Sequence, residues 1–227
     1  MVKYSVIIPT LNEEKFLPRT LQQLKSFNQN LEIIVTDGGS IDKTVSIAQR
    51  EKIHLVASSP GRGIQQKRGA QIAKGEILIF LHVDTILPKQ YFQILESYTN
   101  NPDFSAATFR LKFDEDKFAL NLYSWFSRFE SIFTTFGDQT IIIRKDLYNR
   151  IGGFPEVKIF DDVIILRELR RRKALIKIPH SVITSARRFR KHGLIKTQLL
   201  NGWFIVKYLL GYDVEEIYNS YNNKHSS

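Results

Sequence analysis

The sequence predicts an α/β fold with a Rossmann-like, doubly wound and mostly parallel sheet and a mixed C-terminal half. Over roughly the first 85 residues, β-rich runs alternate with segments of helical spacing, which is the pattern of successive β-α-β crossovers. Residues 77–81, within the strand predicted over 76–81, are continuously apolar, as expected of a parallel strand buried on both faces. After Pro88 the alternation loosens, so the later strands are expected to pair in a mixed way.

The elements of the first half follow one another in short steps. Residues 4–9 form a β-rich run that ends at a proline, and Asn12 is a candidate cap for the helix that follows. Further strands are predicted at residues 31–35, 53–57 and 76–81, and helices at 12–24, 42–51 and 64–74.

The second half is predicted to contain longer helices. Strands are expected at residues 105–113, 140–143 and 174–178, and helices at 90–99, 117–136, 161–172 and 194–210. The helix over 117–136 carries an aromatic stripe, for which packing into the core is favoured and contact with a lipid-linked or aromatic acceptor is the alternative. The terminal helix around Trp203 could equally pack on the core or lie on an anionic membrane surface.

Composition limits the possible classes of protein. The 227 residues, 43% of them apolar, are sufficient for one domain with a sizeable core. There is no cysteine, which excludes disulfides and thiolate metal sites. We see no signal-peptide layout and no apolar run of about 18 residues, so a cytoplasmic protein with possible peripheral contact to the inner membrane face is expected. The net charge of +10 attracts nucleic acid, acidic lipid or phosphorylated small molecules without choosing between them.

Polar clusters follow three of the predicted strands at residues 10–14, 36–40 and 82–85. Ligands of open parallel sheets bind beyond the carboxyl ends of the strands, so a site is expected there. Turn and cap chemistry explains each cluster taken alone equally well. In the last cluster, Asp84 at the mouth of a buried strand has the ligand chemistry for Mg²⁺ or Mn²⁺ shared with phosphate oxygens.

Two further clusters carry charge. Asp161 and Asp162 begin a predicted helix, where they either cap it or supply a general base. Residues 187–192 (RRFRKH) form a basic run that could neutralise a diphosphate, bind nucleic acid or face water.

Together, and in this order, these clusters resemble the family-two glycosyltransferases of GT-A fold. The resemblance rests on residues 5–14 (SVIIPTLNEE), 33–40 (IIVTDGGS) with Asp42 and Thr44, and 61–69 (GRGIQQKRG). It extends from residue 4 to about 210. A small bacterial subgroup with FLHADT, GDQ and TSARR motifs is the most similar, the counterparts here being residues 80–85, 137–139 and 184–188.

The resemblance implies one GT-A domain over residues 1–227, with a nucleotide-binding half (1–88), an acceptor half (89–193) and a helical extension (194–227). It implies transfer of a sugar from a nucleotide-diphosphate sugar, UDP-linked foremost, to an unidentified small-molecule or lipid-linked hydroxyl, with inversion and with Mg²⁺ or Mn²⁺ as cofactor. Nucleic acid is not an expected partner, because no recognised nucleic-acid motif is present.

The same resemblance assigns roles to individual residues. Asp162 is the candidate base with Asp161 beside it, Asp84 holds the metal with His82 or His192 as possible further ligands, and Gly137, Asp138 and Gln139 lie on the acceptor side. The remaining positions are expected to bind the nucleotide-sugar: Pro9, Thr10, Glu13, Asp37, Gly38, Gly39, Arg62, Lys67, His82, Asp84, Arg187 and Arg188.

The chain departs from the family pattern at informative positions. His82 replaces the first carboxylate of the usual Asp-x-Asp, and Asp161 replaces the Glu of the usual Glu-Asp pair. The QxxRW motif of processive synthases is missing, which argues against polymer synthesis. Two other functions stay open from the residues alone: a nucleotidyltransferase of similar fold, and a basic non-catalytic module that binds anions or nucleic acid.

Overall fold

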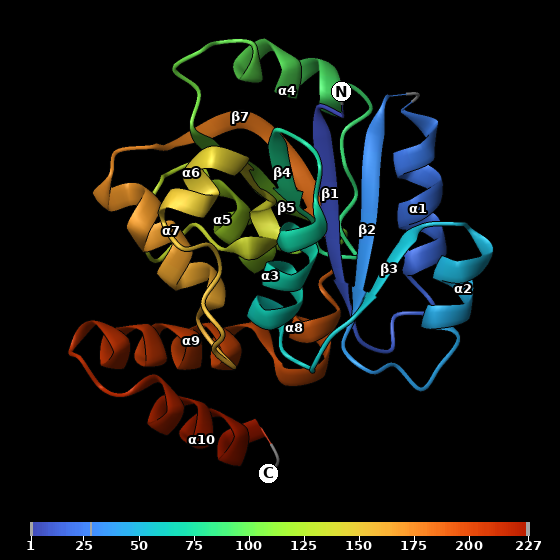
Figure 1. Ribbon diagram of the computed structural model, residues 1–227. Helices are drawn as coiled ribbons and strands as arrows, with labels where there is room; N and C mark the ends of the chain where they lie inside the picture. Colours follow the sequence, from blue (N-terminus) through green and yellow to red (C-terminus); the bar gives the residue numbers. More distant parts are fainter. Residues whose placement is uncertain (1, 28, 226–227) are drawn as a thin grey trace.

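The computed structural model describes residues 2–27 and 29–225, apart from the side chains of 188, 191, 192, 194–196 and 221–225. Within these residues, seven strands form one sheet in the order β3-β2-β1-β4-β6-β5-β7 (Figure 1). The strands are β1 (Tyr4–Thr10), β2 (Leu31–Asp37), β3 (His54–Ala57), β4 (Ile77–Phe80), β5 (Ala106–Phe113), β6 (Ile141–Arg144) and β7 (Leu175–Thr184).

The sheet is parallel on its N-terminal side and mixed beyond β4. Strands β3, β2, β1 and β4 pair in parallel, whereas β6 runs antiparallel to both β4 and β5. Strands β5 and β7 are again parallel to each other. The predicted fold class, including the mixed C-terminal half, is therefore confirmed.

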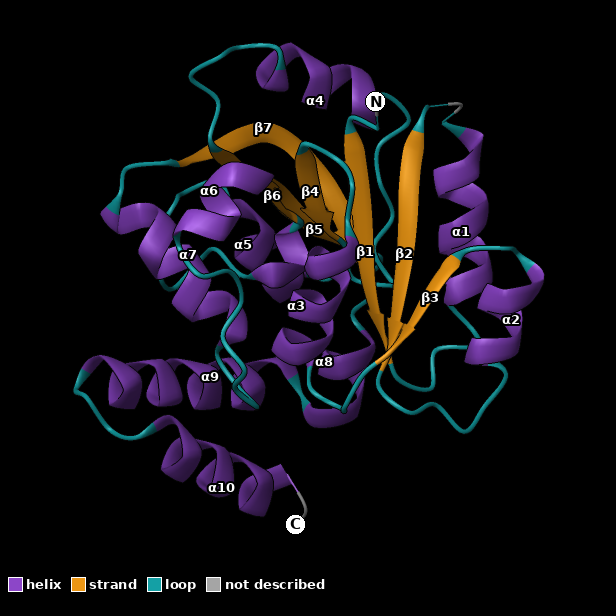
Figure 2. Cartoon of the chain, in the orientation of Figure 1, coloured by secondary structure: helices purple, strands orange, loops and turns teal. Residues whose placement is uncertain are grey.

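Helices cover both faces of the sheet because alternate residues of its buried strands point to opposite sides (Figure 2). In β1, Val6 and Ile8 pack on one face, and Ile7 packs on the other. The first face is covered by α1 (Leu17–Ser26), α2 (Thr44–Arg50) and α4 (Tyr91–Thr99). The second is covered by α3 (Arg62–Ile72), α6 (Lys145–Arg150) and α7 (Asp161–Arg171).

Helices follow β7 at the C-terminal end of the described chain, and the last two form a separate small core with the start of α7. These helices are α8 (Arg187–His192), α9 (Leu194–Leu209) and α10 (Val214–His225), of which only α9 was predicted. Phe204 and Ile205 of α9 pack with Ile217 of α10 and with Phe160 and Val163 at the start of α7. None of the helices in the described part of the chain has the length and apolar content to cross a membrane.

Two predicted helix boundaries are wrong. The first helix begins at Leu17 instead of residue 12, and Asn12 does not cap it: its φ of 56° places it in a turn after β1. The aromatic helix expected to reach residue 136 ends as α5 (Phe118–Phe126). It stops there because Ser127 turns back to the sheet, where its Oγ accepts the Leu111 N–H at 2.9 Å and donates to the Leu111 carbonyl at 3.2 Å.

The aromatic stripe does not enter the core, so the favoured interpretation of it is wrong. Of its seven members only Phe136 packs inside, against the cluster around α9. The others are exposed: Phe118, Leu122, Trp125, Phe126, Phe129 and Phe133. The buried position on α5 is instead Leu120.

The last strand is longer than predicted. It continues past Pro179 to Thr184, and its pairing with β5 shifts register between Phe109 and Arg110, so that Pro179 and His180 are passed over. A bulge of this kind accommodates a proline, which has no N–H to donate to a sheet ladder. The extension carries Thr184 and Ser185 to the candidate site.

Candidate active site

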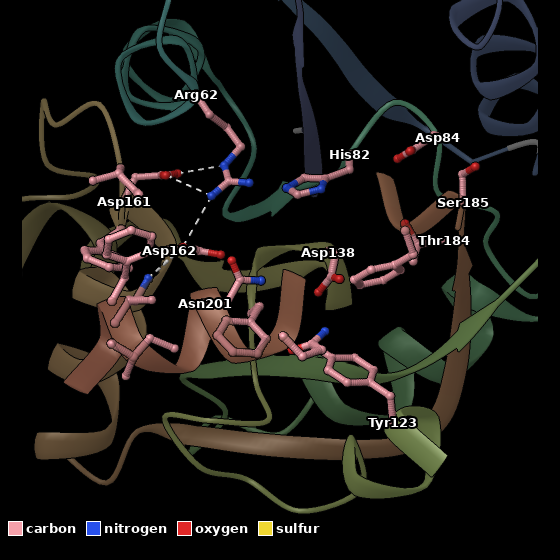
Figure 3. Close-up of a pocket in the computed structure, with 18 of the residues that line it drawn as sticks. Arg62, His82, Asp84, Tyr123, Asp138, Asp161, Asp162, Thr184, Ser185 and Asn201 are labelled. Atoms are coloured by element: carbon pink, nitrogen blue, oxygen red, sulfur yellow. Dashed lines mark hydrogen bonds and ion pairs between the residues drawn. The ribbon is translucent and has the colours of Figure 1, made fainter. Parts of the chain in front are cut away.

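The carboxyl ends of β1, β2 and β4 bring the predicted polar clusters to one edge of the sheet. Thr10 and Asp37 end β1 and β2, and the loop after β4 carries His82 and Asp84. A pocket of about 470 Å³ opens beside this edge, below the start of α7 (Figure 3). Seven predicted residues line it: Arg62, His82, Asp84, Asp138, Asp161, Asp162 and Arg187.

Asp37 organises the turn after β2 and ties it to β1. One carboxylate oxygen accepts the backbone N–H groups of Gly39 and Ser40 at 2.9 and 2.8 Å. The other accepts the hydroxyls of Thr10 at 3.1 Å and Ser40 at 2.5 Å. Gln65, which the sequence analysis did not single out, donates to the carbonyls of Thr10 and Thr36 at 2.7 and 2.8 Å and so holds the two strand ends together.

Arg187 joins the first strand end to the loop after β4. Its guanidinium donates to both oxygens of Glu13 at 2.9 and 2.7 Å, and its Nε lies 3.1 Å from Asp84 Oδ2. Burial raises the pKa of the Asp84 carboxyl, and the charge of Arg187 opposes that rise. The residue expected to meet the diphosphate is therefore paired, in this state, with the residue expected to hold the metal.

Arg62 makes a similar contact with the two acids that begin α7. It donates to both oxygens of Asp161 at 3.0 and 2.9 Å and lies 3.3 Å from Asp162 Oδ1. Burial raises the pKa of Asp161 despite this partner. Burial alone would also raise the pKa of Asp162, but Arg62 and the Gly137 N–H, which donates at 2.8 Å, hold it below its usual value.

Close backbone approaches put these acids in place. A Cβ at Gly63 would lie 2.6 Å from the Pro155 carbonyl and 2.7 Å from the Asp161 Cβ, so the start of α3 meets α7 only through a glycine. A Cβ at Gly137 would stand between Asp162 and His82, 3.2 Å from the Asp162 Oδ2 and 3.3 Å from the His82 Nε2. These close approaches explain why glycine occupies positions 63 and 137 beside the site.

Strained backbone lies next to the site. Asn12, Thr140 and Phe160 adopt positive φ values of 56°, 59° and 65° without being glycine. Each neighbours a predicted site residue: Glu13, Gln139 and Asp161, respectively. Asparagine adopts this conformation comparatively readily, but for the β-branched Thr140 and the bulky Phe160 it costs about 1–3 kcal/mol each. Such strain persists where the surrounding structure fixes it, which is frequent at functional sites.

Two polar atoms in the pocket have no partner among the described residues: His82 Nε2 and Asp138 Oδ1. Burial, with the nearby Arg62, lowers the pKa of His82 to about 3, so its imidazole is neutral at pH 7. Burial, with the charge of Asp162, raises the pKa of Asp138 to about 7. Figure 3 shows His82, Asp138 and Asp162 around the same pocket, with the His82 ring directed toward Arg62. A buried polar atom without a partner is expected to bind a ligand or water.

The opposite wall of the pocket is aromatic and was not predicted. Its rings come from β5, from the segment 118–136, from the residue before α7, from α8 and from α9. They are Phe113, Tyr123, Phe136, Phe160, Phe189 and Phe204. Asn201 of α9 and Tyr218 of α10 also line it. A helical pattern of aromatics was visible in the sequence, but which rings turn inward depends on how α9 and α10 fold back over the site.

Two predicted residues occupy other places, and the side chains of two more are not described. Gln139 is buried and donates to the Thr134 carbonyl at 2.5 Å while accepting from Lys177, so it anchors the loop before β6. Lys67 pairs with Glu156 at 2.9 Å and lines a separate cavity of about 510 Å³. The side chains of Arg188 and His192 lie outside the described residues, so their predicted roles have no geometry here.

The donor set fits a divalent cation that arrives with phosphate oxygens. No group of three or more His, Cys, Asp or Glu side chains able to hold a metal is found in the described part of the chain. Asp84 is a single hard oxygen ligand, and Mg²⁺ is commonly bound through one or two carboxylates together with substrate phosphates. His82, neutral and with a free Nε2, lies two residues away as a possible nitrogen ligand, although Figure 3 shows its ring directed toward Arg62.

Comparison with known proteins gives the family. The model of the family described as "Glycosyl transferase family 2" matches residues 5–160. Poly(ribitol-phosphate) β-N-acetylglucosaminyltransferase TarS of Staphylococcus aureus is 32% identical over 100 residues, which are 40% of this chain and 18% of that protein. Undecaprenyl-phosphate 4-deoxy-4-formamido-L-arabinose transferase of Photorhabdus laumondii is 34% identical over 100 residues, 39% of this chain and 31% of that protein. The chain thus matches less than a third of the length of either relative.

Solved structures share the fold. The mannosyltransferase PcManGT from Pyrobaculum calidifontis, in complex with GDP-Man and Mn²⁺, superposes with a TM-score of 0.71 at 18% identity, covering 95% of this chain and 66% of that one. Residues 1–349 of Staphylococcus aureus TarS with UDP-GlcNAc give a TM-score of 0.62 at 20% identity, covering 81% and 58%. At these identities the likeness establishes the GT-A architecture.

Proposed function

Since the chain belongs to glycosyl transferase family 2, we propose that it transfers a sugar from a nucleotide-diphosphate sugar, UDP-linked foremost, to a hydroxyl group of an acceptor held against the aromatic wall. One observation carries this proposal: the acids and arginines at the strand ends and the aromatic rings face each other across a single pocket. One wall suits a diphosphate, and the other suits a partly apolar acceptor.

For the donor, we propose the edge formed by Thr10, Glu13 and Asp37, with Asp84 as ligand of Mg²⁺ or Mn²⁺. When bound, the metal supplies positive charge that offsets the charge of the diphosphate. Arg187, whose Nε now lies against Asp84, is the side chain placed to exchange that carboxylate for a phosphate oxygen.

The proposed reaction is a direct displacement with inversion. The acceptor oxygen forms a bond to the anomeric carbon while the bond from that carbon to the diphosphate oxygen breaks, and the hydroxyl proton passes to Asp162. Asp162 suits this role because Arg62 and the Gly137 N–H fix its orientation. Asp161 is the second candidate, but Arg62 donates to both of its oxygens, whereas at Asp162 it lies near Oδ1 alone.

Asp138 is proposed to bind the acceptor. Its Oδ1 has no partner in the described part of the chain, and it faces the same space as Asp162. In its ionised form it accepts a hydrogen bond from a second acceptor hydroxyl, and in its protonated form it donates one. The family match removes the support for the two alternatives, a nucleotidyltransferase and a non-catalytic basic module.

A thermal-shift screen of nucleotide-sugars, with and without Mn²⁺, tests the donor assignment. A donor present at about 100 times its Kd should stabilise the fold by about 2.7 kcal/mol, and the stabilisation should depend on the metal. Asp84→Ala should remove the metal-dependent part, whereas Asp146→Ala, a change on the exposed side of α6, should keep it. If no donor raises the melting temperature, or Asp84→Ala responds like the wild type, the donor site is misassigned. Release of pyrophosphate in place of a nucleoside diphosphate would restore the nucleotidyltransferase alternative.

A further inference from the structure

Helix α9 is apolar on two opposite faces. Its inner face, with Thr197, Phe204 and Ile205, is buried against the domain. Its outer face presents Leu199 and Trp203, which are 71% and 52% exposed, and is continued by the C-cap residue Leu210, which is 71% exposed. A helix on the surface of a protein in water normally turns polar residues outward, and an apolar outer face indicates a further binding partner.

A second exposed apolar surface lies on the segment 118–133. Phe118, at the start of α5, is 84% exposed. Trp125 contacts the rings of Phe126 and Phe129 at centroid distances of 5.0 and 5.2 Å, so the rings form one continuous patch. The remaining members are Leu122 and Phe133. We call this the aromatic patch.

Both surfaces border the active-site pocket. The segment that carries the aromatic patch contributes Tyr123 to the pocket wall, Phe136 follows three residues after its end, and α9 contributes Asn201 and Phe204. Each segment therefore has one side toward the pocket and another toward the outside. A partner that covers the outer sides would lie beside the pocket.

Charge identifies the kind of partner. Residues 187–212 contain six lysines and arginines and no aspartate or glutamate. Two of the six are already paired, Arg187 with Glu13 and Asp84 in the site and Arg190 with Glu115. Within this stretch, the Lys207 ammonium lies 5.8 Å from the centroid of Trp203 and 5.5 Å from that of Tyr212, beside the apolar face. Arg128 lies 4.7 Å from the centroid of Trp125 in the aromatic patch. A second copy of this chain would bring two such basic segments together, whereas an anionic lipid surface offers opposite charge and apolar depth at once.

We propose that the protein binds the surface of an anionic lipid bilayer through the outer face of α9 and the aromatic patch. Tryptophan and phenylalanine enter the boundary between headgroups and acyl chains, and the flanking lysines and arginines contact acidic headgroups. The pocket then opens beside the membrane. Together with the proposed function, on which this consequence rests, the acceptor is a hydroxyl-bearing molecule anchored in lipid.

The two tryptophans of the chain make the test direct, because Trp125 lies in the aromatic patch and Trp203 on α9. Trp125→Phe leaves a reporter on α9, and Trp203→Phe leaves one in the aromatic patch. Vesicles of phosphatidylcholine with phosphatidylglycerol should shift the emission of both variants to shorter wavelength and sediment with the protein. Affinity for vesicles of phosphatidylcholine alone should be lower by about tenfold or more. Added salt should lower the affinity for the vesicles that contain phosphatidylglycerol.

Surface variants separate docking from folding. Leu199→Gln with Leu210→Gln should lower affinity for anionic vesicles about tenfold or more, because two exposed apolar side chains no longer enter the lipid. Ile72→Gln, at an exposed apolar position on α3, is the matched control and should bind within about twofold of the wild type. Thermal melts should show all of these variants folded, since each replaced side chain is exposed.

Three results would overturn the proposal: no sedimentation with either vesicle, wild-type binding by the double variant, or an emission shift that grows with protein concentration without lipid while a dimer forms. The last result would assign the face to a second copy of the chain. Vesicle binding needs no substrate, so failure to find a donor leaves this test intact. Loss of vesicle binding likewise leaves the donor screen unaffected.

Discussion

The two walls of the pocket differ in how far their polar groups are satisfied. At the strand ends, Asp37 is bound by its own turn and Asp84 by Arg187, and at the start of α7 Asp161 is bound by Arg62. Asp138 Oδ1, on the acceptor side, and His82 Nε2, in the loop after β4, have no partner among the described residues, and the surface outside the acceptor side is apolar. A donor must therefore compete with the existing hydrogen bonds and ion pairs of the first wall. On the acceptor side, an unpartnered polar atom remains free to bind a ligand.

The largest effect of a single substitution on activity is expected at Asp162, which lies between the two walls. Asp162→Asn should lower the turnover of transfer by about 10²–10⁴, the range typical of a general base. The side-chain oxygen of the asparagine can still accept the Gly137 N–H, so the local structure should be kept and binding of the nucleotide should change little. Single-turnover kinetics and nucleotide titration measure the two effects, and unchanged transfer would refute the assignment.

Arg187 tests the strand-end wall. Arg187→Gln removes the contacts to Glu13 and Asp84, and turnover should fall by about 10²–10³ if the guanidinium also stabilises the departing diphosphate. The matched control is Arg190→Gln, which loses only an exposed pair with Glu115. Equal activity of the two variants would show that Arg187 has a purely structural role.

Two leucines on α5 contrast the buried and exposed sides of the aromatic segment. Leu120 is 2% exposed and Leu122 is 47% exposed. Leu120→Ala should destabilise the protein by about 2–5 kcal/mol, whereas Leu122→Ala should cost less than about 1 kcal/mol. Urea unfolding measures both. Similar costs would mean that the outer face of α5 is covered in solution.

The smallest effect is a pH dependence of stability from Asp138. Its pKa in the fold is raised to about 7, so this carboxyl favours the fold less as pH rises from about 4 to 7. Asp138→Asn removes this pH-dependent loss of stability. The difference in melting temperature between the variant and the wild type should therefore increase from about pH 5 to pH 8. Each kcal/mol of stability that the variant retains should appear as about 2–4 °C. Asp146→Asn is the control, because the pKa of Asp146 is lowered and its difference should stay flat over that interval.

Much of the fold could be predicted because it depends on local pattern. The apolar run at 77–81 and the polar turn at Asp37 identify a buried parallel strand and a strand end without reference to the rest of the chain. The helix boundaries at Asn12 and Phe126 could not be predicted in this way. They depend on a left-handed turn and on Ser127 bonding to a strand 16 residues earlier.

The sequence by itself determined the family, the α/β sheet and the set of acids and arginines from which a site could be built, because spacing and turn chemistry are written in neighbouring residues. Only the tertiary structure decided which of them meet. Arg187 reaches Glu13 across 174 positions, and Arg62 reaches Asp161 across 99. The outward turn of the aromatic residues after Phe118 was decided at the same level, since burial depends on what the rest of the chain places against a helix, and helical spacing is the same on either side.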